Sequence, residues 1–524
     1  MFSRFSTSLS IRQASMRIAR QHSHLYSTQA KQVQEKILTD ILIVGGGPAG
    51  LTLASAIKSS PLLKHYKTTL VDATPISSSL PAFYEKASSD DQFPFTNRVV
   101  SITPRNMDFL TADLNLPLMF NRIQPFDGIC ISDGLSDFNT LTMDRDSMGY
   151  MVELMNLQSS AHQKIMELNK SFTDPNEKIQ IIDNCKVLDI KSPKIEAEEE
   201  GNAKNTLFSN AWPEVELDNG QIFKTRLLIG CDGFNSPVRK FANIDSLGWF
   251  YNKWGVVATM KLECPPFNQI RGWQRFLPTG PIAHLPLPND NATLVWSTTP
   301  ELSQLLTKVP GPVFAKLVNA AFLLEDGDMQ YYYSKLRQVK DLSDESDPIY
   351  GELIGDISYR MEDKSEHITK FYGKNDMYFL EENYPPTVVE IQDKSRARFP
   401  MKMFHCNTYV APRVALVGDA AHATHPLAGQ GLNMGLGDSM SLVKALEQAS
   451  SRGLDLGQTD FVLNEYWKDR YGTNMMLLGV TDKLHKLYGS SNPIVTTARQ
   501  FGVSVLNNIG GLKSLMMNIV SGPK

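Results

Sequence analysis

The first clear pattern of hydrophobic positions is a run of four apolar residues, ILIV, at 41–44. A run of this length predicts a buried strand. The glycine-rich turn GGGPAG follows, and residues 51–60 then have the character of a helix that Pro61 ends. The apolar stretch TTLVDA at 68–73 predicts a second strand. Strand, helix and strand in this order predict the opening βαβ unit of an α/β fold.

Two later stretches repeat the combination of an apolar strand and a turn of small residues. In TRLLIGCDGFNSPVRK, residues 225–240, the predicted strand ends at Asp232 and Gly233. In RVALVGDAAHATHPLAGQGLNMGLGD, residues 413–438, the strand ends at Gly418 and Asp419. Ligands of open α/β sheets bind at the edge where the parallel strands end. All three turns are therefore candidate ligand-binding turns.

A different pattern occupies the chain between Trp249 and Thr299, where segments such as GVVATMKL and ATLVWSTTP alternate with prolines. Short strands and turns of this kind predict an antiparallel sheet, which we interpret as a second domain inserted in the first. From residue 325 to 393 there are 17 Asp or Glu against 7 Lys or Arg. We interpret this stretch as a polar insertion whose charge forms a solvated face.

Composition narrows the class of protein. The chain has 524 residues, which exceeds the usual size of a single core, and a formal net charge of −4 gives no general reason to expect nucleic-acid binding. The five cysteines are at least 33 residues apart, so no CxxC pair indicates a zinc or iron–sulfur site. Redox chemistry in this chain would therefore come from a bound organic cofactor.

The first thirty residues differ from the rest of the chain. They contain Arg4, Arg12, Arg17 and Arg20 with many serines, and the first acidic residue is Glu35. This pattern is typical of a mitochondrial transit peptide, so residues 1–35 are excluded from the predicted fold; a disordered basic tail is the alternative. No apolar run reaches the roughly 18 residues that a membrane span needs.

The first glycine turn has the spacing of a dinucleotide site. Gly45, Gly47 and Gly50 occupy the GxGxxG positions, and Asp72 follows Gly50 by 22 residues at the end of the second strand. The first glycine permits a tight turn, the second lets the backbone approach a pyrophosphate, and the third lets helix and strand pack closely. A carboxylate about 20 residues further on binds the ribose hydroxyls.

The three turns taken in order, GGGPAG, DGFNSPVR and GDAAH with GQGLNMG, resemble the signature of the single-component flavin monooxygenases typified by para-hydroxybenzoate hydroxylase. The string HPLAGQGLNMGLGD at 425–438, with NRVVSITP at 97–104 and GYMVE at 149–153, is similar to the ubiquinone-biosynthesis ring hydroxylases. The resemblance implies a Rossmann-like FAD-binding domain, an inserted antiparallel β-sheet substrate domain, and C-terminal helices. The expected bounds are 36–115, 150–245 and 400–450 for the first, 246–399 for the second, and 451–524 for the third.

The turns and the resemblance together predict a set of FAD-binding residues. They are Gly45, Gly47, Gly50, Asp72, Arg98, Asp232, Gly418, Asp419, Pro426, Gly429, Gln430, Gly431 and Asn433. A helix that begins at Gly429 would aim its positive end at the pyrimidine side of the flavin. Two assignments have alternatives, because Arg98 also fits a surface arginine and Asp232 also fits a brace for its own turn.

Substrate contacts are less defined. Arg398 and His425 are candidates by resemblance, although His422 and His425 also fit structural histidines. No residue is assigned as the catalytic base, and no metal site is expected. The resemblance implies a reduced flavin that reacts with dioxygen to form a flavin hydroperoxide, which hydroxylates a polyprenylated 4-hydroxybenzoate or related prenylphenol in ubiquinone synthesis. The alternatives are a flavin reductase or dehydrogenase on the same fold, and a non-catalytic, FAD-stabilised subunit of a biosynthetic complex.

The expected partners follow from this chemistry. The resemblance implies a mitochondrial matrix protein, peripheral on the inner membrane, associated with the ubiquinone-biosynthesis complex and reduced by ferredoxin and its reductase or by NAD(P)H. A ferredoxin, being acidic, would dock on the basic stretch from Lys394 to Lys402, although these residues fit the binding of the substrate carboxylate equally well. From Lys483 to Lys524 the chain has no acidic residue, and apolar residues recur at helical spacing. This segment fits either an anionic membrane surface or helices packed on the flavin domain.

Overall fold

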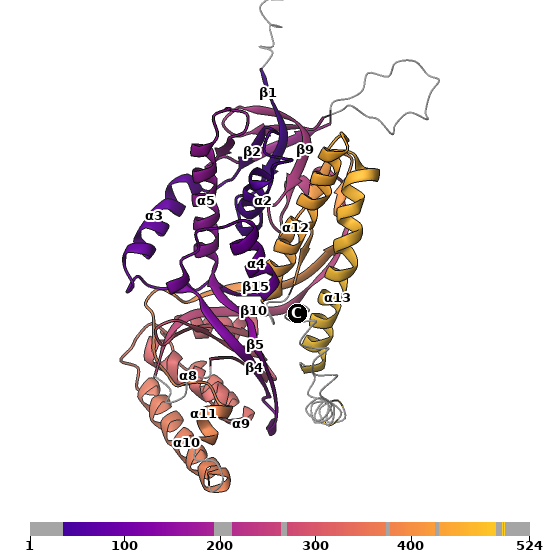
Figure 1. The fold of residues 1–524 in the computed structure, drawn as a ribbon. Coiled ribbons are helices and arrows are strands. Elements are labelled where there is room, and N and C mark those ends of the chain that lie inside the picture. The colour runs from indigo at the N-terminus through magenta and orange to yellow at the C-terminus, as the bar shows by residue number, and fades with distance from the viewer. Residues whose placement is uncertain are drawn as a thin grey trace, which may run out of the picture.

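The computed structural model describes residues 35–192, 212–263, 270–373, 378–424 and 429–488, together with Val495 and Thr497. Almost all of the expected leader and of the acid-free C-terminal segment lies outside these residues, as do His425 and Pro426. The described residues form two sheets with helices around them, as Figure 1 shows. The predicted α/β fold class is confirmed.

Sheet A is a mainly parallel sheet, with the strand order β16-β17-β9-β1-β2-β6 and with β8 and β7 added beside β9. Its central strand β1 pairs in parallel with β2 on one side and β9 on the other. The apolar run 41–44 lies in β1 and is buried on both faces. The strands are β1 (Lys36–Val44), β2 (Thr68–Val71), β6 (Ile179–Ile182), β7 (Val187–Lys191), β8 (Glu214–Leu217), β9 (Ile222–Gly230), β16 (Val410–Ala411) and β17 (Val414–Leu416).

Helices cover sheet A because the crossovers between parallel strands return over its faces. Helix α2 packs against α5 and α12, and α13 runs beside α12 (Figure 1). These helices and sheet A share one large apolar core, to which Leu436 and Leu446 of α12 belong. The helices of this part are α2 (Pro48–Ser59), α3 (Ile76–Ser89), α4 (Pro104–Asp108), α5 (Leu154–Ser171), α6 (Pro237–Phe241), α12 (Gln430–Ser451) and α13 (Asn464–Tyr488).

Sheet B has the order β18-β15-β10-β13-β12-β11-β4-β5-β3, with β14 beside β10, and only the β4–β11 pair is parallel. It also contains three strands from before residue 246, which the predicted bounds of the second domain did not include. The strands are β3 (Val99–Ile102), β4 (Gln124–Asp133), β5 (Ser136–Glu153), β10 (Ser246–Leu262), β11 (Arg271–Leu277), β12 (Gly280–Leu287), β13 (Asn291–Thr298), β14 (Val388–Ile391), β15 (Ala397–Cys406) and β18 (His422–Ala423).

A helical layer lies on the side of sheet B away from sheet A (Figure 1). It consists of α7 (Pro300–Lys308), α8 (Gly311–Leu323), α9 (Asp326–Leu336), α10 (Pro348–Tyr372) and α11 (Phe379–Asn383). The acidic stretch 325–393 forms most of this layer, and Tyr332 and Tyr333 on its inner side belong to the same core as Val256 of β10. The stretch is therefore a packed helical cover with a charged outer face.

Candidate active site

The three glycine turns meet at the carboxyl edge of sheet A. Strands β1, β9 and β17 are neighbours and run in parallel, so their ends lie side by side. Main-chain hydrogen bonds join them there, since the N–H of Cys231 donates to the Val44 carbonyl at 2.7 Å and that of Val417 donates to the Gly230 carbonyl at 2.9 Å. Turns that are about 190 residues apart in sequence thus form one edge.

The first turn has the shape that a pyrophosphate needs. Gly45 has φ +108°, and a Cβ at Gly50 would lie 1.9 Å from the Gly45 carbonyl oxygen, so neither position admits a larger residue. A Cβ at Gly47, in contrast, would meet no atom within 4 Å. The main chain at Gly47 is therefore open to an approaching group, and α2 begins directly after it with its unpaired N–H groups. This geometry fits the diphosphate of FAD.

Asp72 lies beside this turn, at the end of β2. One carboxylate oxygen accepts a hydrogen bond from the N–H of Gly46 at 2.6 Å, and the other accepts from the N–H of Thr74 at 2.7 Å. The structure thus places the carboxylate against the glycine turn, at the position from which the predicted ribose contact would be made.

The second turn holds a carboxylate with spare hydrogen-bonding capacity. Asp232 accepts a hydrogen bond from the N–H of Val238 through Oδ2 at 3.2 Å, whereas its Oδ1 is buried without a hydrogen-bond partner among the described residues. Burial raises the pKa of this carboxyl group. The side chain therefore braces its own turn and also leaves one oxygen for a ligand, so the two interpretations of Asp232 are compatible.

Arg239 joins the second turn to the third. Its guanidinium donates to the carbonyl of Ala420 at 2.8 Å and also to that of Phe234, and it lies over the ring of Phe404. The same short helix is capped by Ser236, whose hydroxyl accepts from the N–H of Arg239 at 2.9 Å. The serine and arginine of the DGxxSxxR motif thus hold the two turns together.

The third turn begins with Gly418, which has φ +61°, and Asp419 is exposed at it. The start of α12 closes on this turn, because a Cβ at Gly435 would lie 3.3 Å from the Gly418 Cα. Gly429, also at φ +61°, forms the N-cap of α12, where Gln430 is buried. The helix predicted to start at this glycine is confirmed.

Asn433, a predicted cofactor residue, holds the start of α12 in place. Its Oδ1 accepts from the N–H of Thr103 at 3.1 Å and from Nδ2 of Asn106 at 2.8 Å, and its Nδ2 donates to the Ser101 carbonyl at 2.7 Å. These bonds occupy the amide, so the side chain fixes the first turn of α12 against the segment between β3 and α4.

Two predicted residues are exposed. Arg98 lies just before β3. Arg398 donates from its guanidinium to Ser303 Oγ of α7 at 3.2 Å and lies 4.6 Å from the ring of Trp254. Its register partner Val256 belongs to the core beneath the helices, so Arg398 lies on the α7 side of β15, and its contact with the substrate stays a prediction.

The basic residues of the predicted docking stretch differ in their surroundings. Arg396 donates to the carbonyls of Leu306 and Val309, at the end of α7. Lys402 lies over the ring of Phe234. Lys394 and Arg398 are exposed, so the stretch stays a predicted docking surface.

His422 is a structural histidine in this site. It is completely buried, and its Nε2 donates to Asp438 Oδ2 of α12 at 2.6 Å. Sequence reasoning missed Asp438 and its further partner Arg470 on α13, because the contact joins two helices over 32 residues. The local signal was the pair of glycines in GLGD, which are unfavourable inside a helix and therefore indicate a close contact there.

The third turn also joins the two sheets. Strand β18 follows it within the chain and pairs with β15 of sheet B at Phe404 and His405. A dinucleotide-type turn, two further turns at the same edge and a second sheet attached to that edge define an FAD-dependent monooxygenase of the aromatic-hydroxylase class.

Comparisons with known proteins agree with this class. The FAD binding domain family matches residues 359–456. The crystal structure of p-nitrophenol 4-monooxygenase from Pseudomonas putida superposes with a TM-score of 0.58, at 14% identity, over 94% of this chain and 100% of that one. At this identity the likeness shows the fold alone.

Closer relatives identify the family. The mitochondrial ubiquinone biosynthesis monooxygenase COQ6 of Saccharomyces cerevisiae is 50% identical over 93% of this chain and 94% of its own length. The protein of the same name from Schizosaccharomyces pombe is 35% identical over 94% of both chains. The chain belongs to the COQ6 family of ubiquinone biosynthesis monooxygenases, in agreement with the resemblance in its motifs.

Two further properties concern the described residues only. No helix among them is both long and apolar enough to cross a membrane. Within the same part of the chain, no group of three or more His, Cys, Asp or Glu residues is arranged to hold a metal ion.

Proposed function

We propose that this FAD-dependent monooxygenase hydroxylates the ring of a polyprenylated 4-hydroxybenzoate or a related prenylphenol during ubiquinone biosynthesis. The observation that carries the proposal is the meeting of three glycine turns at the edge of sheet A where sheet B is attached. Membership of the COQ6 family supports the choice of pathway.

Each turn has a proposed part in holding FAD. The open main chain at Gly47 and the start of α2 would bind the diphosphate, and Asp72 the adenosine ribose. Asp232 would offer its unpaired oxygen, and Asp419 would accept hydrogen bonds from the ribityl hydroxyls. The first turn of α12, Gly429–Gly431, would lie at the pyrimidine end of the flavin with its positive dipole. When bound, FAD supplies the activation of dioxygen.

The protein's own task is to position the ring and keep water away from it. We place the ring between sheet B and the edge of sheet A, on the face of β10 that carries Thr259. Thr259 Oγ1 donates to the Phe95 carbonyl at 3.4 Å, so this face is turned to the segment before β3, whereas Val256 and Ala258 face the helical layer. A ring held there would be screened from solvent by both sheets.

The electron donor is proposed as a class: ferredoxin with its reductase, or NAD(P)H. Arg396 and Arg398 contact α7, while Arg398 and Lys394 are exposed, so the basic stretch remains the proposed docking site for ferredoxin. Rapid mixing of the oxidised protein with reduced ferredoxin or with NADPH would separate the two donors by the rate at which the flavin absorbance is lost.

The location is proposed from the relatives and the composition. The COQ6 proteins are named mitochondrial, and the segment 483–524 has no acidic residue. We propose a peripheral position on the inner membrane, within an assembly of ubiquinone-biosynthesis proteins. Cosedimentation with anionic liposomes would test the membrane part. Equal binding by the full chain and by a chain that ends at residue 493 would remove the role proposed for this segment.

The central experiment follows the oxygen atom. The bound flavin is reduced without oxygen, and labelled dioxygen and a prenylated 4-hydroxybenzoate are then added. Label in the ring of the product, read by mass spectrometry, is the expected result. A flavin that reoxidises without labelling any prenylphenol would favour a reductase, or a subunit in which FAD serves stability alone.

A further inference from the structure

A completely buried carboxylate lies behind the third turn. Asp438 of α12 has no exposed surface, and it accepts four hydrogen bonds. Its Oδ2 accepts from the N–H of Gly418 at 3.1 Å and from His422 Nε2 at 2.6 Å. Its Oδ1 accepts from Arg470 Nε at 3.0 Å and from Asn474 Nδ2 at 3.0 Å. One oxygen thus holds the third turn, and the other holds α13.

The charge of this cluster is balanced by Arg470. Burial by itself raises the pKa of Asp438, but the attraction and hydrogen bond of His422 and the charge of Arg470 outweigh it and keep that pKa well below its ordinary value. Asp438 in turn raises the pKa of Arg470 against the opposing effect of burial. An isolated buried carboxylate is strongly unfavourable, so the ionised form of Asp438 depends on its partners: His422 of β18 first, and then Arg470 and Asn474 of α13.

The main chain of α12 is shaped for this arrangement. A Cβ at Gly437 would lie 2.6 Å from Arg470 Nη2, so the guanidinium would have to shift from its present place beside Asp438 if this residue were larger. A Cβ at Gly435 would lie 3.3 Å from the Gly418 Cα, on the side of the turn. Two glycines of one helix thus make room for the two sides of the same carboxylate.

We infer that Arg470 is a positioning residue of the flavin site, which acts through Asp438 on the main-chain N–H of Gly418 and thereby on the orientation of Asp419. The inference rests on the proposed place of FAD at the third turn. Arg470 fixes the carboxylate of Asp438, that carboxylate fixes the start of the turn, and the next residue in the chain presents its side chain to the ribityl hydroxyls.

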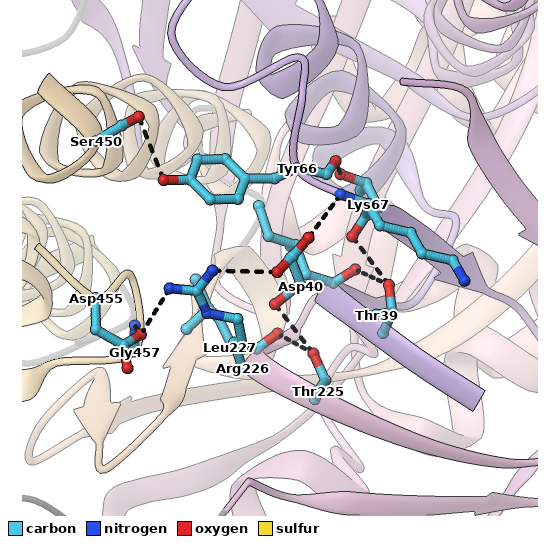
Figure 2. Close-up of polar contacts among 12 residues, drawn as sticks. Thr39, Asp40, Tyr66, Lys67, Thr225, Arg226, Leu227, Ser450, Asp455 and Gly457 are labelled. Atoms are coloured by element: carbon cyan, nitrogen blue, oxygen red, sulfur yellow. Dashed lines mark hydrogen bonds and ion pairs between the residues drawn. The ribbon is translucent and has the colours of Figure 1, made fainter. Parts of the chain in front are cut away.

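The chain offers a matched control for this arginine. Arg226 of β9 also pairs with aspartates, donating to Asp40 Oδ1 at 3.2 Å and lying 3.7 Å from Asp455 Oδ1 (Figure 2). It lies on β9, six residues before Asp232 of the second turn, which is about 20 Å at the rise of a strand. Arg226→Met removes an arginine–aspartate pair in the same domain without touching the proposed flavin site.

The test compares full-length holoproteins. The wild type is compared with Arg470→Met, Arg470→Lys, Arg226→Met and Asp419→Ala, and each must show the far-ultraviolet circular dichroism of a folded chain. The dissociation constant of FAD is measured from the fluorescence of released flavin, and the visible absorption bands of bound flavin are recorded. A role in stability alone would lower the unfolding temperature but leave these two flavin properties unchanged.

The expected result is a dissociation constant raised about ten- to a hundredfold by Arg470→Met, with shifted visible bands, because a hydrogen bond to a charged group is lost behind the turn. Arg470→Lys keeps the charge but not the geometry, so we expect a smaller rise, whereas Arg226→Met should change the constant less than about twofold.

Two outcomes would overturn the inference. One is an Arg470→Met protein whose FAD affinity and spectrum match those of Arg226→Met. If Arg470→Met does not fold, the test rests on Arg470→Lys. An Arg470→Lys protein with the FAD affinity and spectrum of the wild type would then overturn the inference. Asp419→Ala separates this failure from failure of the proposed site. If Asp419→Ala weakens FAD binding while Arg470→Met does not, only the role of Arg470 fails; if neither does, the third turn is not the flavin site.

Discussion

Two arginine–aspartate clusters of the same domain show what burial does to an ion pair. In one, Arg470 and Asp438 join α13 to the third turn, and their side chains are 14% and 0% exposed. In the other, Arg226 joins β1 to the loop after α12 through Asp40 and Asp455, and its side chain and that of Asp40 are 26% and 28% exposed (Figure 2). Water screens the charges of the second cluster. In the first cluster water does not reach Asp438, so its charge is stabilised by its hydrogen-bond donors instead. The chemistry is similar, but only the buried pair is coupled to the site.

The largest expected effect is that of Asp438→Asn. The substitution leaves Arg470 without its buried counter-charge. It also replaces one accepting oxygen of Asp438 by an NH₂ group, which then faces the donors Gly418 and His422 or the donors Arg470 and Asn474. We expect the free energy of unfolding to fall by roughly 3–5 kcal/mol. Urea denaturation of the holoprotein measures it. A loss no greater than that caused by Arg226→Met would erase the contrast between the two clusters.

The next effect is that of Gly435→Ala. The added methyl group would meet the Gly418 Cα at 3.3 Å, so α12 or the turn has to shift. Overpacking of this kind costs about 1–3 kcal/mol. We expect a lower unfolding temperature together with weaker FAD binding. Gly453→Ala is not a suitable control, since that glycine has φ +68°; Gly472→Ala, with no atom within 4 Å of the added carbon, is suitable.

The stability difference between the wild type and Asp438→Asn should depend on pH. The folded protein holds the pKa of Asp438 below its unfolded value. The stability that this carboxylate provides is therefore fully present above the ordinary Asp pKa of about 3.9, and it is lost as the pH falls through the lower folded value. The difference in free energy of unfolding between the two proteins should stay constant from pH 7 to about 5 and narrow only below about 4. A difference that narrows near pH 6 would point to another group.

The smallest effect belongs to the exposed cluster. Arg226→Met should lower the free energy of unfolding by about 1 kcal/mol or less, and the loss should shrink as salt is added. Chemical denaturation at low and high ionic strength checks both statements. A salt-independent loss as large as that of Asp438→Asn would show that exposure is not what distinguishes the clusters.

The sequence predicts those parts of the site that depend on a few residues close together in the chain. A buried strand, a glycine turn and a carboxylate within a few residues identify each turn, because strand ends and φ > 0 positions limit the residues allowed. Their meeting at one edge then follows from parallel pairing. The helix that starts at Gly429 was predicted for the same reason, from the glycines of its first turn.

The parts that were missed depend on contacts between distant segments. Nothing near Arg470 indicates that it reaches Asp438, and nothing near Arg398 indicates that α7 takes its guanidinium. Strands β4 and β5 were not assigned to sheet B, since the choice of sheet is made by partners such as β11, which lies more than 100 residues further along the chain. Packing decides such contacts, and local propensity does not reveal them.

Helix α13 is attached at both ends. Near its start, Arg470 and Asn474 hold Asp438; near its end, Asp482 accepts from the hydroxyl of Tyr251 on β10 at 3.0 Å, and Tyr488 stacks on Phe276 of β11. From Arg470 to Tyr488 the helix spans about 27 Å. A single rigid helix therefore links the two sheets. If sheet B moved at Tyr251, α13 would carry part of that movement to the carboxylate behind Gly418.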